Sequence, residues 1–535
     1  MAWLRRPIFL APASLLLGGV LVIVRGRPSL LSDTGVFMSV AGRLLRGDRL
    51  YVNVIDNKDP LFFYTHAAAL AVLGWRGPTL LDVVWLAIAA ASCAMLLRAL
   101  TFPTGAIALG FFSYPFLLSG SWYLAGYSML PGLALIPLVG WLWLTKRFTL
   151  AGAVIGVGGF LQIDIVPLLA SMPIALLILK RPSRAVATPV LMGLAGFAAV
   201  ALAGCLVLAL AGELSGYAQN LVRNVAYSHD AFKALGETGG ILGHIKVAEG
   251  AIANPIRRVV VAGLFVAAAL VAARALGRSR TANASPTQDP RVRAMAVLFL
   301  CAAVATALTL SLTAVWPQHD QMLAYPGTML AVFIYVVAEQ RGAGGYRHAA
   351  NWALSLAVIV VVGGSVQAHN GRLSSWFHET HSVPAILIEH SAAGALSSSA
   401  AVTFAHLGSN DEEGFAAFLA DRFSLACPEI DQYPFSPNLT GALQCIRIKK
   451  PELVLVTPSF RRYFRTAPAW DRFVTEGAHL LNATYDRAAT GRGFYGLTEV
   501  WVRRAATSIH TADVSVAVER SPGRLRARPS DRTRL

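Results

Sequence analysis

The chain has 535 residues, of which 55% are hydrophobic and only 14% are charged, and its mean hydropathy of +0.55 excludes an ordinary soluble protein. The formal net charge is +17, but Lys and Arg stand mostly between apolar segments and near the carboxy terminus. They do not alternate with aromatic residues on one face, so this charge indicates the cytoplasmic loops of a membrane protein and argues against nucleic acid as a partner.

The first apolar segment, 8–24, follows Arg5 and Arg6 and lacks a small-residue cleavage site. It is therefore predicted to be an uncleaved signal anchor with a cytoplasmic amino terminus. In hydrocarbon every backbone polar group needs an internal partner, so this segment and the later ones are predicted to be helices. Further spans are predicted at 79–97, 103–119, 128–145, 188–211, 259–276, 294–315, 323–339 and 350–367.

Two shorter apolar segments, 149–161 and 165–179, are separated by Gln162-Ile163-Asp164 and flanked by basic pairs. They predict a hairpin with both ends in the cytoplasm, which brings the total to about eleven membrane-embedded segments. The segment 61–75 would span only about 22 Å as a helix, less than the roughly 30 Å core of a bilayer. If it crossed, the basic pair at 146–147 would face outside, so it is predicted to be interfacial or re-entrant.

After residue 368 the pattern changes to short alternating runs, at 401–405 and 452–456, and helical stretches near 411–424 and 468–478. The predicted fold class is an all-α polytopic membrane protein with a carboxy-terminal extracytoplasmic α/β domain, located in the plasma membrane. The predicted parts are a membrane core at 1–368 with a first external loop at 25–78, the α/β domain at 369–504, and a basic disordered tail at 505–535.

Five cysteines are too few for a disulfide scaffold, and no spacing of metal ligands is present. Cys93, Cys205 and Cys301 each stand alone in an apolar segment, which is typical of a small buried hydrophobic residue. Cys427 and Cys445 share the predicted α/β domain, and the sequence is equally compatible with a disulfide and with two free thiols.

The first external loop is the most polar stretch before the α/β domain. Ser32 or Asp33 can cap a helix whose apolar residues fall at helical spacing from Val36 to Leu45, so this helix is predicted to lie on the membrane surface. Taken alone, Asp33 is more simply a helix cap than a catalytic group.

Asp33, the Ala41-Gly-Arg-Leu-Leu-Arg-Gly47 stretch, Leu50-Tyr51 and Asp56-Asn-Lys-Asp-Pro-Leu-Phe-Phe-Tyr64 together resemble the first external loop of the GT-C glycosyltransferases. The nearest kin are the bacterial mannosyl, arabinosyl and aminoarabinosyl transferases that use polyprenyl-phosphate sugars. The resemblance covers about 35 residues, and beyond them it is one of architecture. Many relatives have Pro-Pro where this chain has Asp59-Pro60, which leaves the use of Asp59 open.

The resemblance implies that Asp33 is the catalytic base of an inverting transfer, accepting the proton of the acceptor hydroxyl. A phosphate leaving group needs a nearby cation, and Lys58 is a candidate for this role or for a simple ion pair with Asp56. The main candidate donor-binding or acceptor-binding residues are Asp56, Lys58, Tyr64, Asp164, Arg223, His229 and His319. The polar loop 212–258 also offers Asn224, Lys246, Arg257 and Arg258.

Alternatives stay open for several of these candidates. Asp164 lies at the predicted hairpin tip, where an ionisable residue is costly unless it binds substrate or meets a partner such as a first-loop Arg. His319 follows Trp316-Pro317 and resembles the polar turn near the donor phosphate in GT-C relatives, but an ordinary interfacial His fits as well. The loop 119–127 lacks the acidic metal ligands of several relatives, so no metal cofactor is expected, although a divalent ion held elsewhere stays possible.

The expected function is therefore transfer of a sugar from a polyprenyl-phosphate donor to a lipid, polysaccharide or protein acceptor of the cell envelope. The alternatives are a transporter or flippase of lipid-linked glycans and a non-catalytic assembly subunit. No internal inverted repeat is visible in the sequence, which argues against a transporter, and the presence of Asp33 argues against a subunit that has lost its catalytic acid.

Overall fold

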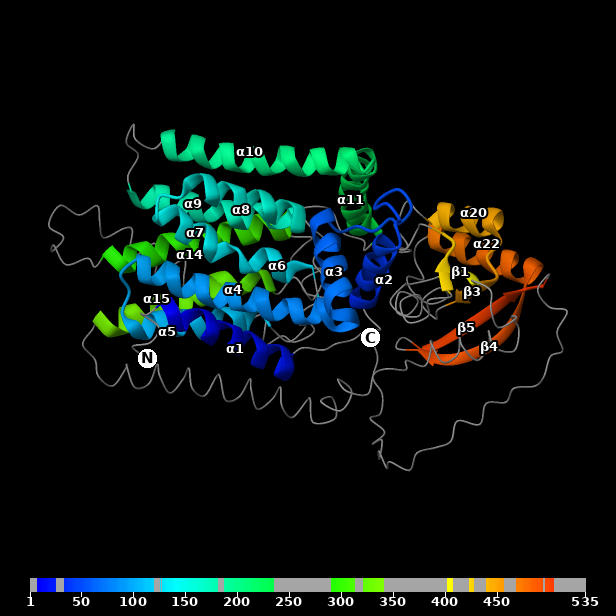
Figure 1. The fold of residues 1–535 in the computed structure, drawn as a ribbon, viewed down its shortest axis with the longest axis horizontal. Helices are drawn as coiled ribbons and strands as arrows, with labels where there is room; N and C mark the ends of the chain where they lie inside the picture. The colour runs from blue at the N-terminus through cyan, green and yellow to red at the C-terminus, as the bar shows by residue number, and fades with distance from the viewer. Residues whose placement is uncertain are drawn as a thin grey trace, which may run out of the picture.

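The computed structural model describes residues 7–25, 33–119, 126, 128–180, 187–234, 290–312, 321–340, 402–407, 423–427, 439–456, 468–493 and 496–504. The described part is mostly helical, with one small sheet (Figure 1). The predicted spans at 259–276 and 350–367, and the predicted tail at 505–535, lie outside these residues.

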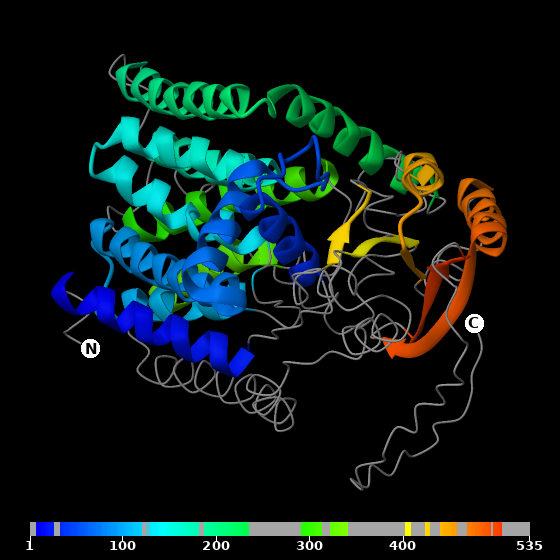
Figure 2. The same ribbon diagram turned by 45° about the vertical axis from the view of Figure 1, so that its right-hand side comes forward.

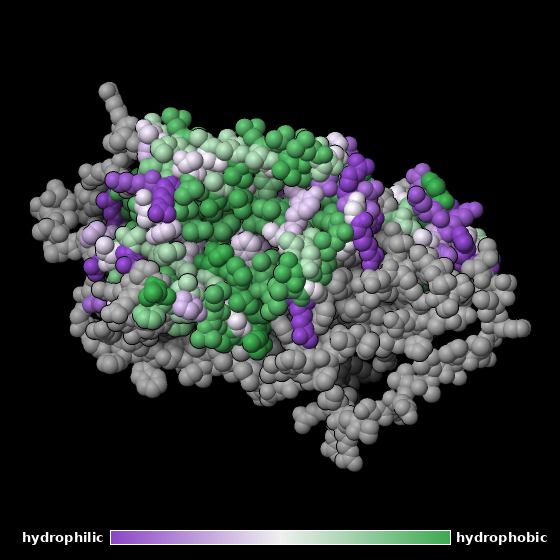
Figure 3. All heavy atoms as spheres, viewed as in Figure 1, coloured by the Kyte–Doolittle hydropathy of each residue, from purple (hydrophilic) through white to green (hydrophobic). Residues whose placement is uncertain are grey.

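On the face seen in Figure 3, the helical bundle has hydrophobic side chains across its middle and hydrophilic ones towards its two ends. Among the described residues, α4, α10 and residues 290–309 of α14 are long and apolar enough to cross a membrane. The long helices of the bundle are α1 (Pro7–Arg25), α4 (Gly77–Ala99), α5 (Thr104–Leu118), α8 (Phe148–Leu161), α9 (Val166–Lys180), α10 (Ala187–Leu210), α14 (Pro290–Leu312) and α15 (Ala324–Gln340).

Two shorter helices, α2 (Asp33–Leu45) and α3 (Pro60–Leu73), run across the direction of the long helices at one end of the bundle (Figure 1). A short 3₁₀ turn, η2 (Gly74–Arg76), joins α3 to α4. After α10 the chain turns at Gly212, which has φ +70°, and enters α11 (Leu214–Ala234). Helix α11 then leaves the bundle at an angle to α10 (Figure 2).

The segment 128–145, predicted as one helix, is divided at Leu135 into α6 (Met129–Ala134) and α7 (Ile136–Leu144). Pro137 lacks an N–H group, so it cannot donate to the carbonyl of Leu133, four residues earlier. The Tyr114 hydroxyl donates to that carbonyl instead, at 2.5 Å. A proline that removes one helical hydrogen bond thus explains the irregularity at Leu135 within the predicted span.

Helices α8 and α9 are joined by Gln162 and the 3₁₀ turn η3 (Ile163–Ile165). Helix α10 packs on α8 with very little space between the two backbones. A Cβ atom added to Gly152 would lie 1.8 Å from the Gly193 carbonyl oxygen, and one added to Gly196 would lie 1.9 Å from that of Thr149. Small residues that let two helices approach closely are typical of packing within a membrane.

The carboxy-terminal part contains a five-stranded sheet with the order β2-β1-β3-β5-β4. Strand β1 is parallel to β2 and β3, whereas β5 is antiparallel to β3 and β4. The elements are β1 (Val402–Leu407), β2 (Phe423–Leu425), α20 (Leu439–Lys449), β3 (Leu453–Val456), α22 (Pro468–Thr484), β4 (Tyr485–Gly493) and β5 (Gly496–Arg503).

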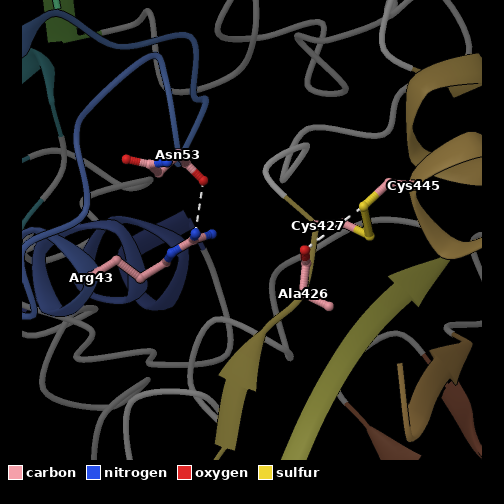
Figure 4. The surroundings of a disulfide bond; sticks show 5 residues. All are labelled: Arg43, Asn53, Ala426, Cys427 and Cys445. Atoms are coloured by element: carbon pink, nitrogen blue, oxygen red, sulfur yellow. Dashed lines mark hydrogen bonds between the residues drawn. A yellow bond between two sulfur atoms is a disulfide. The ribbon is translucent and has the colours of Figure 1, made fainter. Parts of the chain in front are cut away.

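This part has a core of its own, which includes the buried side chains of Leu443, Val454 and Phe473. Cys427 and Cys445 form a disulfide that ties the chain after β2 to α20 (Figure 4). The helical stretch predicted near 411–424 is wrong at its end, because residues 423–425 pair with β1 as strand β2. The rest of that stretch lies outside the described residues.

Candidate active site

The chain between α2 and α3 is a folded loop held by its own polar contacts. Arg43, in the last turn of α2, donates to Asp48 at 2.7 Å. It also donates to the carbonyl of Asn53 at 2.7 Å (Figure 4). Tyr51 has φ +61°, a conformation that costs energy for a residue with a side chain. Its N–H group donates to the Val54 carbonyl and its hydroxyl donates to the Lys58 carbonyl, both at 2.6 Å. These bonds hold the loop in one compact shape.

Glu213 fastens this loop to the start of α11. Its buried carboxylate accepts a hydrogen bond from the Leu50 N–H group at 2.8 Å and another from the Tyr64 hydroxyl at 2.5 Å. The first loop, α3 and α11 therefore meet at one side chain. Gly216, in the first turn of α11, makes this approach possible, because a Cβ atom there would lie 2.7 Å from the Tyr51 carbonyl oxygen.

Asp59 makes a second junction, between the first loop, the turn after α8 and α11. Its buried carboxylate accepts a hydrogen bond from the Ile163 N–H group at 2.8 Å and one from the Tyr217 hydroxyl at 2.9 Å. The Ile163 N–H group is available because α8 ends at Leu161. Asp59 thus connects three segments that are far apart in the sequence.

Burial, together with the charge of the nearby Asp164 carboxylate, raises the pKa of Asp59 to about 6. The bonds from Ile163 and Tyr217 and the positive charge of Lys58 act in the opposite direction but do not cancel the effect of burial. The same burial, together with the charge of Asp59, raises the pKa of the Tyr217 hydroxyl, so Tyr217 stays a hydrogen-bond donor.

Lys58 lies among these carboxyl groups. Its backbone N–H group donates to the buried carboxylate of Asp56 at 3.0 Å, and its side-chain charge acts on both Asp59 and Asp164. Asp164 in turn accepts a hydrogen bond from the side chain of Gln162. Both Lys58 and Asp164 are only half-buried, so their charged side chains are partly accessible from outside the protein.

The structure brings several of the predicted site residues together. Asp56, Lys58 and Asp164 lie at the Asp59 junction, and Tyr64 lies at the Glu213 junction. Arg223 is half-buried on α11 beside Asn224, whose side-chain amide donates to the Asn57 carbonyl at 2.8 Å. None of these contacts tests a role in binding, so the predicted roles stay predictions.

Asp33 is the first residue of α2, but its side chain is not among those the structure describes. The same holds for the side chain of His229 in α11, and His319 lies outside the described residues altogether.

Sequence reasoning missed Glu213, Tyr217 and Asn220, and it left Asp59 without a role. The sequence did carry a signal for Glu213, because it is the single acidic residue between the apolar segment 188–211 and the polar helix that follows. In α11, residues 217, 220 and 224 follow at spacings that place them on one helix face. The sequence does not say which segment that face contacts.

Within the described ranges, no group of three or more His, Cys, Asp and Glu side chains is arranged to hold a metal ion. The described carboxylates of Asp59 and Glu213 each accept two hydrogen bonds from protein donors. A metal-free site stays a prediction.

What the arrangement offers chemically is a cation, Lys58, beside half-buried and buried carboxylates at the end of a helical bundle. No protein-family model matches this sequence, and a search of curated proteins finds no similar sequence either.

Proposed function

We propose that this chain is a polytopic membrane glycosyltransferase of the GT-C type, which transfers a sugar from a polyprenyl-phosphate donor to a cell-envelope acceptor. The observation that supports it most is the folding of the first loop onto the turn after α8 and onto α11. This loop carries the resemblance to GT-C enzymes, and the Asp59 and Glu213 junctions hold it at the end of the bundle with Lys58 beside Asp164.

The proposed reaction is a single displacement. The acceptor oxygen forms a bond to the anomeric carbon while the bond from that carbon to the phosphate oxygen breaks, and the polyprenyl phosphate leaves with the electron pair. Asp33 accepts the acceptor's hydroxyl proton, which makes the oxygen a better nucleophile. The Lys58 ammonium group stabilises the negative charge that develops on the leaving phosphate.

The proposed topology has about eleven membrane-embedded segments, with the first loop and the carboxy-terminal domain on the outer side of the plasma membrane. Two features support this placement. In both views the sheet lies beyond the end of the bundle that carries α2, α3 and α11 (Figures 1 and 2). The disulfide between Cys427 and Cys445 is typical of an oxidising compartment.

The site assignment is tested with the purified full chain in lipid nanodiscs and radiolabelled polyprenyl-phosphate sugars. We expect Asp33→Asn to lower the transfer rate by about 100-fold or more, as loss of a general base does, and Lys58→Met to lower it by a similar factor. Asp48→Asn is the matched control, because Asp48 is a first-loop carboxylate that pairs with Arg43.

The control should keep transfer within a few-fold of wild type. Inversion at the anomeric carbon, read by NMR of the product, is the second expected result. If Asp33→Asn transfers as fast as wild type, the assignment of the base is wrong.

A further inference from the structure

Two buried side-chain amides close to the Asp59 junction each have a polar atom with no hydrogen-bond partner among the described residues. These atoms are Oε1 of Gln162 and Nδ2 of Asn220. Gln162 is 6% exposed and Asn220 is 4% exposed. An unpaired buried amide is costly, so folded proteins rarely keep one unless water or a ligand completes it.

Gln162 is held in place by its neighbours. The next residue, Ile163, donates its N–H group to Asp59, and the other end of the Gln162 amide donates to Asp164. The unpaired oxygen Oε1 belongs to that same amide group, so it lies beside the Asp164 carboxylate. It can only accept a hydrogen bond.

Asn220 is placed by the contacts of its own helix. Tyr217, one turn earlier in α11, donates to Asp59, and Asn224, one turn later, donates to the Asn57 carbonyl. Asn220 lies between them on the same face of α11, the face that contacts the first loop at Asn57 and Asp59. Its unpaired group, Nδ2, can only donate a hydrogen bond.

We infer that Gln162 and Asn220 bind the hydroxyl groups of a sugar ring that lies beside Lys58 and Asp164. An unpaired acceptor and an unpaired donor together match hydroxyl groups, which donate to one and accept from the other. A phosphate oxygen has no hydrogen for Gln162, and an ammonium group has no lone pair for Asn220. The inference rests on the proposed function and adds to it two residues that select the sugar and do not take part in the bond exchange.

The most informative variant is Asn220→Leu, which keeps the branched shape and the number of side-chain heavy atoms but has no polar atoms. Replacing an unpaired buried amide by an apolar group should leave thermal stability equal or higher. The affinity for polyprenyl-phosphate mannose or polyprenyl-phosphate arabinose should fall about tenfold, the effect of losing one buried hydrogen bond. The affinity for polyprenyl phosphate without sugar should stay the same.

Gln162→Met should weaken the binding of the same sugar lipids, with the affinity for the bare lipid phosphate again retained. Asn224→Leu is the matched control on α11, because its amide already has a protein partner. We expect that variant to lose stability and to keep the ratio between the affinities for sugar-bearing and bare lipid.

Equilibrium binding of these three lipids and of free methyl mannoside and methyl arabinoside, measured on the full chain in nanodiscs, separates the possible results. If the variants weaken only the sugar lipids, the ring belongs to the donor; if they weaken only the methyl glycosides, it belongs to the acceptor.

If wild type transfers sugar and Asn220→Leu keeps all affinities, the inference is wrong while the proposed function stands, and water completes the two amides. If wild type neither transfers sugar nor distinguishes sugar lipid from bare lipid, both are overturned.

Discussion

Asp59 shows how a single buried side chain can hold together three segments that are distant in the sequence. A buried carboxylate is stable only when donors surround it, and here the donors come from the turn after α8 and from α11. The pKa of about 6 shows that these donors and Lys58 do not fully replace the lost water. Ionised Asp59 is therefore a strong hydrogen-bond acceptor that holds the first loop against the turn after α8 and against α11. Keeping this charge buried lowers the folding stability.

The free-energy cost of burying ionised Asp59 predicts how the stability of the protein depends on pH. The folded pKa of Asp59 is about 6 and the ordinary value is 3.8. Between these values the folded protein holds a proton that the unfolded chain has released, so stability falls as pH rises from about 4 to about 6. The fall is at most about 3 kcal/mol, since two pKa units correspond to roughly that energy.

Asp59→Asn lacks this titration, so the wild type should lose stability relative to the variant across that window. The check is thermal denaturation of both proteins in the same detergent at several pH values from 4 to 7. A stability difference between the two proteins that does not change with pH would contradict the raised pKa.

Glu213 also joins segments that are distant in the sequence, so two of its variants should differ in stability. Glu213→Gln keeps an oxygen for the Leu50 N–H group and a donor for the Tyr64 hydroxyl oxygen. Glu213→Ala leaves both partners unpaired, and the buried Leu50 N–H group alone costs about 1–3 kcal/mol when it has no acceptor. We expect the Ala variant to be less stable than the Gln variant by at least about 1 kcal/mol, measured by thermal denaturation in detergent. Equal stabilities would show that the junction contributes little.

At the scale of elements, hydropathy predicts where helices lie better than it predicts how they meet. The apolar segments at 79–97, 149–161 and 188–211 correspond closely to α4, α8 and α10, because a helix in hydrocarbon needs a long apolar stretch. The division at Leu135 was not predicted, since a proline near a helix middle is compatible with a kink, a break or neither. Only the Tyr114 hydroxyl, from another helix, shows how the freed carbonyl is satisfied.

The junctions of the candidate site could not be predicted for the same reason. Periodicity shows that residues 217, 220 and 224 share a face of α11, but not that this face meets residues 57–59. The contact between Asp59 and Tyr217 spans 158 positions of sequence. Such a pairing depends on how all the intervening helices pack, and a single sequence carries no local signal of it.

The packing of α8 on α10 leads to a prediction at this scale. A methyl group on Gly152 would meet the Gly193 backbone at 1.8 Å, so Gly152→Ala must push the two helices apart. We expect a loss of about 1–3 kcal/mol in stability, the usual cost of overpacking. In the same helix a Cβ on Gly159 would lie 3.3 Å from a side-chain carbon of Val166.

Gly159→Ala is therefore the matched control, and it should change stability by less than about 1 kcal/mol. Both variants are compared by thermal denaturation in detergent and by the yield of monodisperse protein. If the two substitutions have equal effects, α8 and α10 do not pack through this glycine.

For the whole molecule, the helical bundle and the sheet have separate hydrophobic cores, and the disulfide belongs to the second of them. Cys427 lies after β2 and Cys445 lies in α20, separated by 18 positions. In the chain-entropy view, closing a loop of this size restricts the unfolded chain and stabilises the fold by about 3 kcal/mol. The sequence alone left this pairing open, because spacing does not show which elements pack together.

The disulfide makes a prediction for the intact cell. Cys427 and Cys445 should react with a membrane-impermeant maleimide only after reduction of intact cells, which places the sheet on the outer side. The double variant Cys427→Ala, Cys445→Ala should show no reduction-dependent labelling. Reaction of both thiols without reduction, or only after cell lysis, would contradict the proposed topology.

The central claim is that the first loop, held at the end of the bundle by Asp59 and Glu213, forms the site of sugar transfer from a polyprenyl phosphate. The most direct test incubates the purified wild-type chain in nanodiscs with a panel of radiolabelled polyprenyl-phosphate sugars and an extract of cell-envelope glycans. We predict that one donor is consumed, that polyprenyl phosphate is released in equal amount, and that the label moves to the acceptor. No consumption of any donor, or movement of intact lipid-linked sugar across the membrane without release of polyprenyl phosphate, would contradict it.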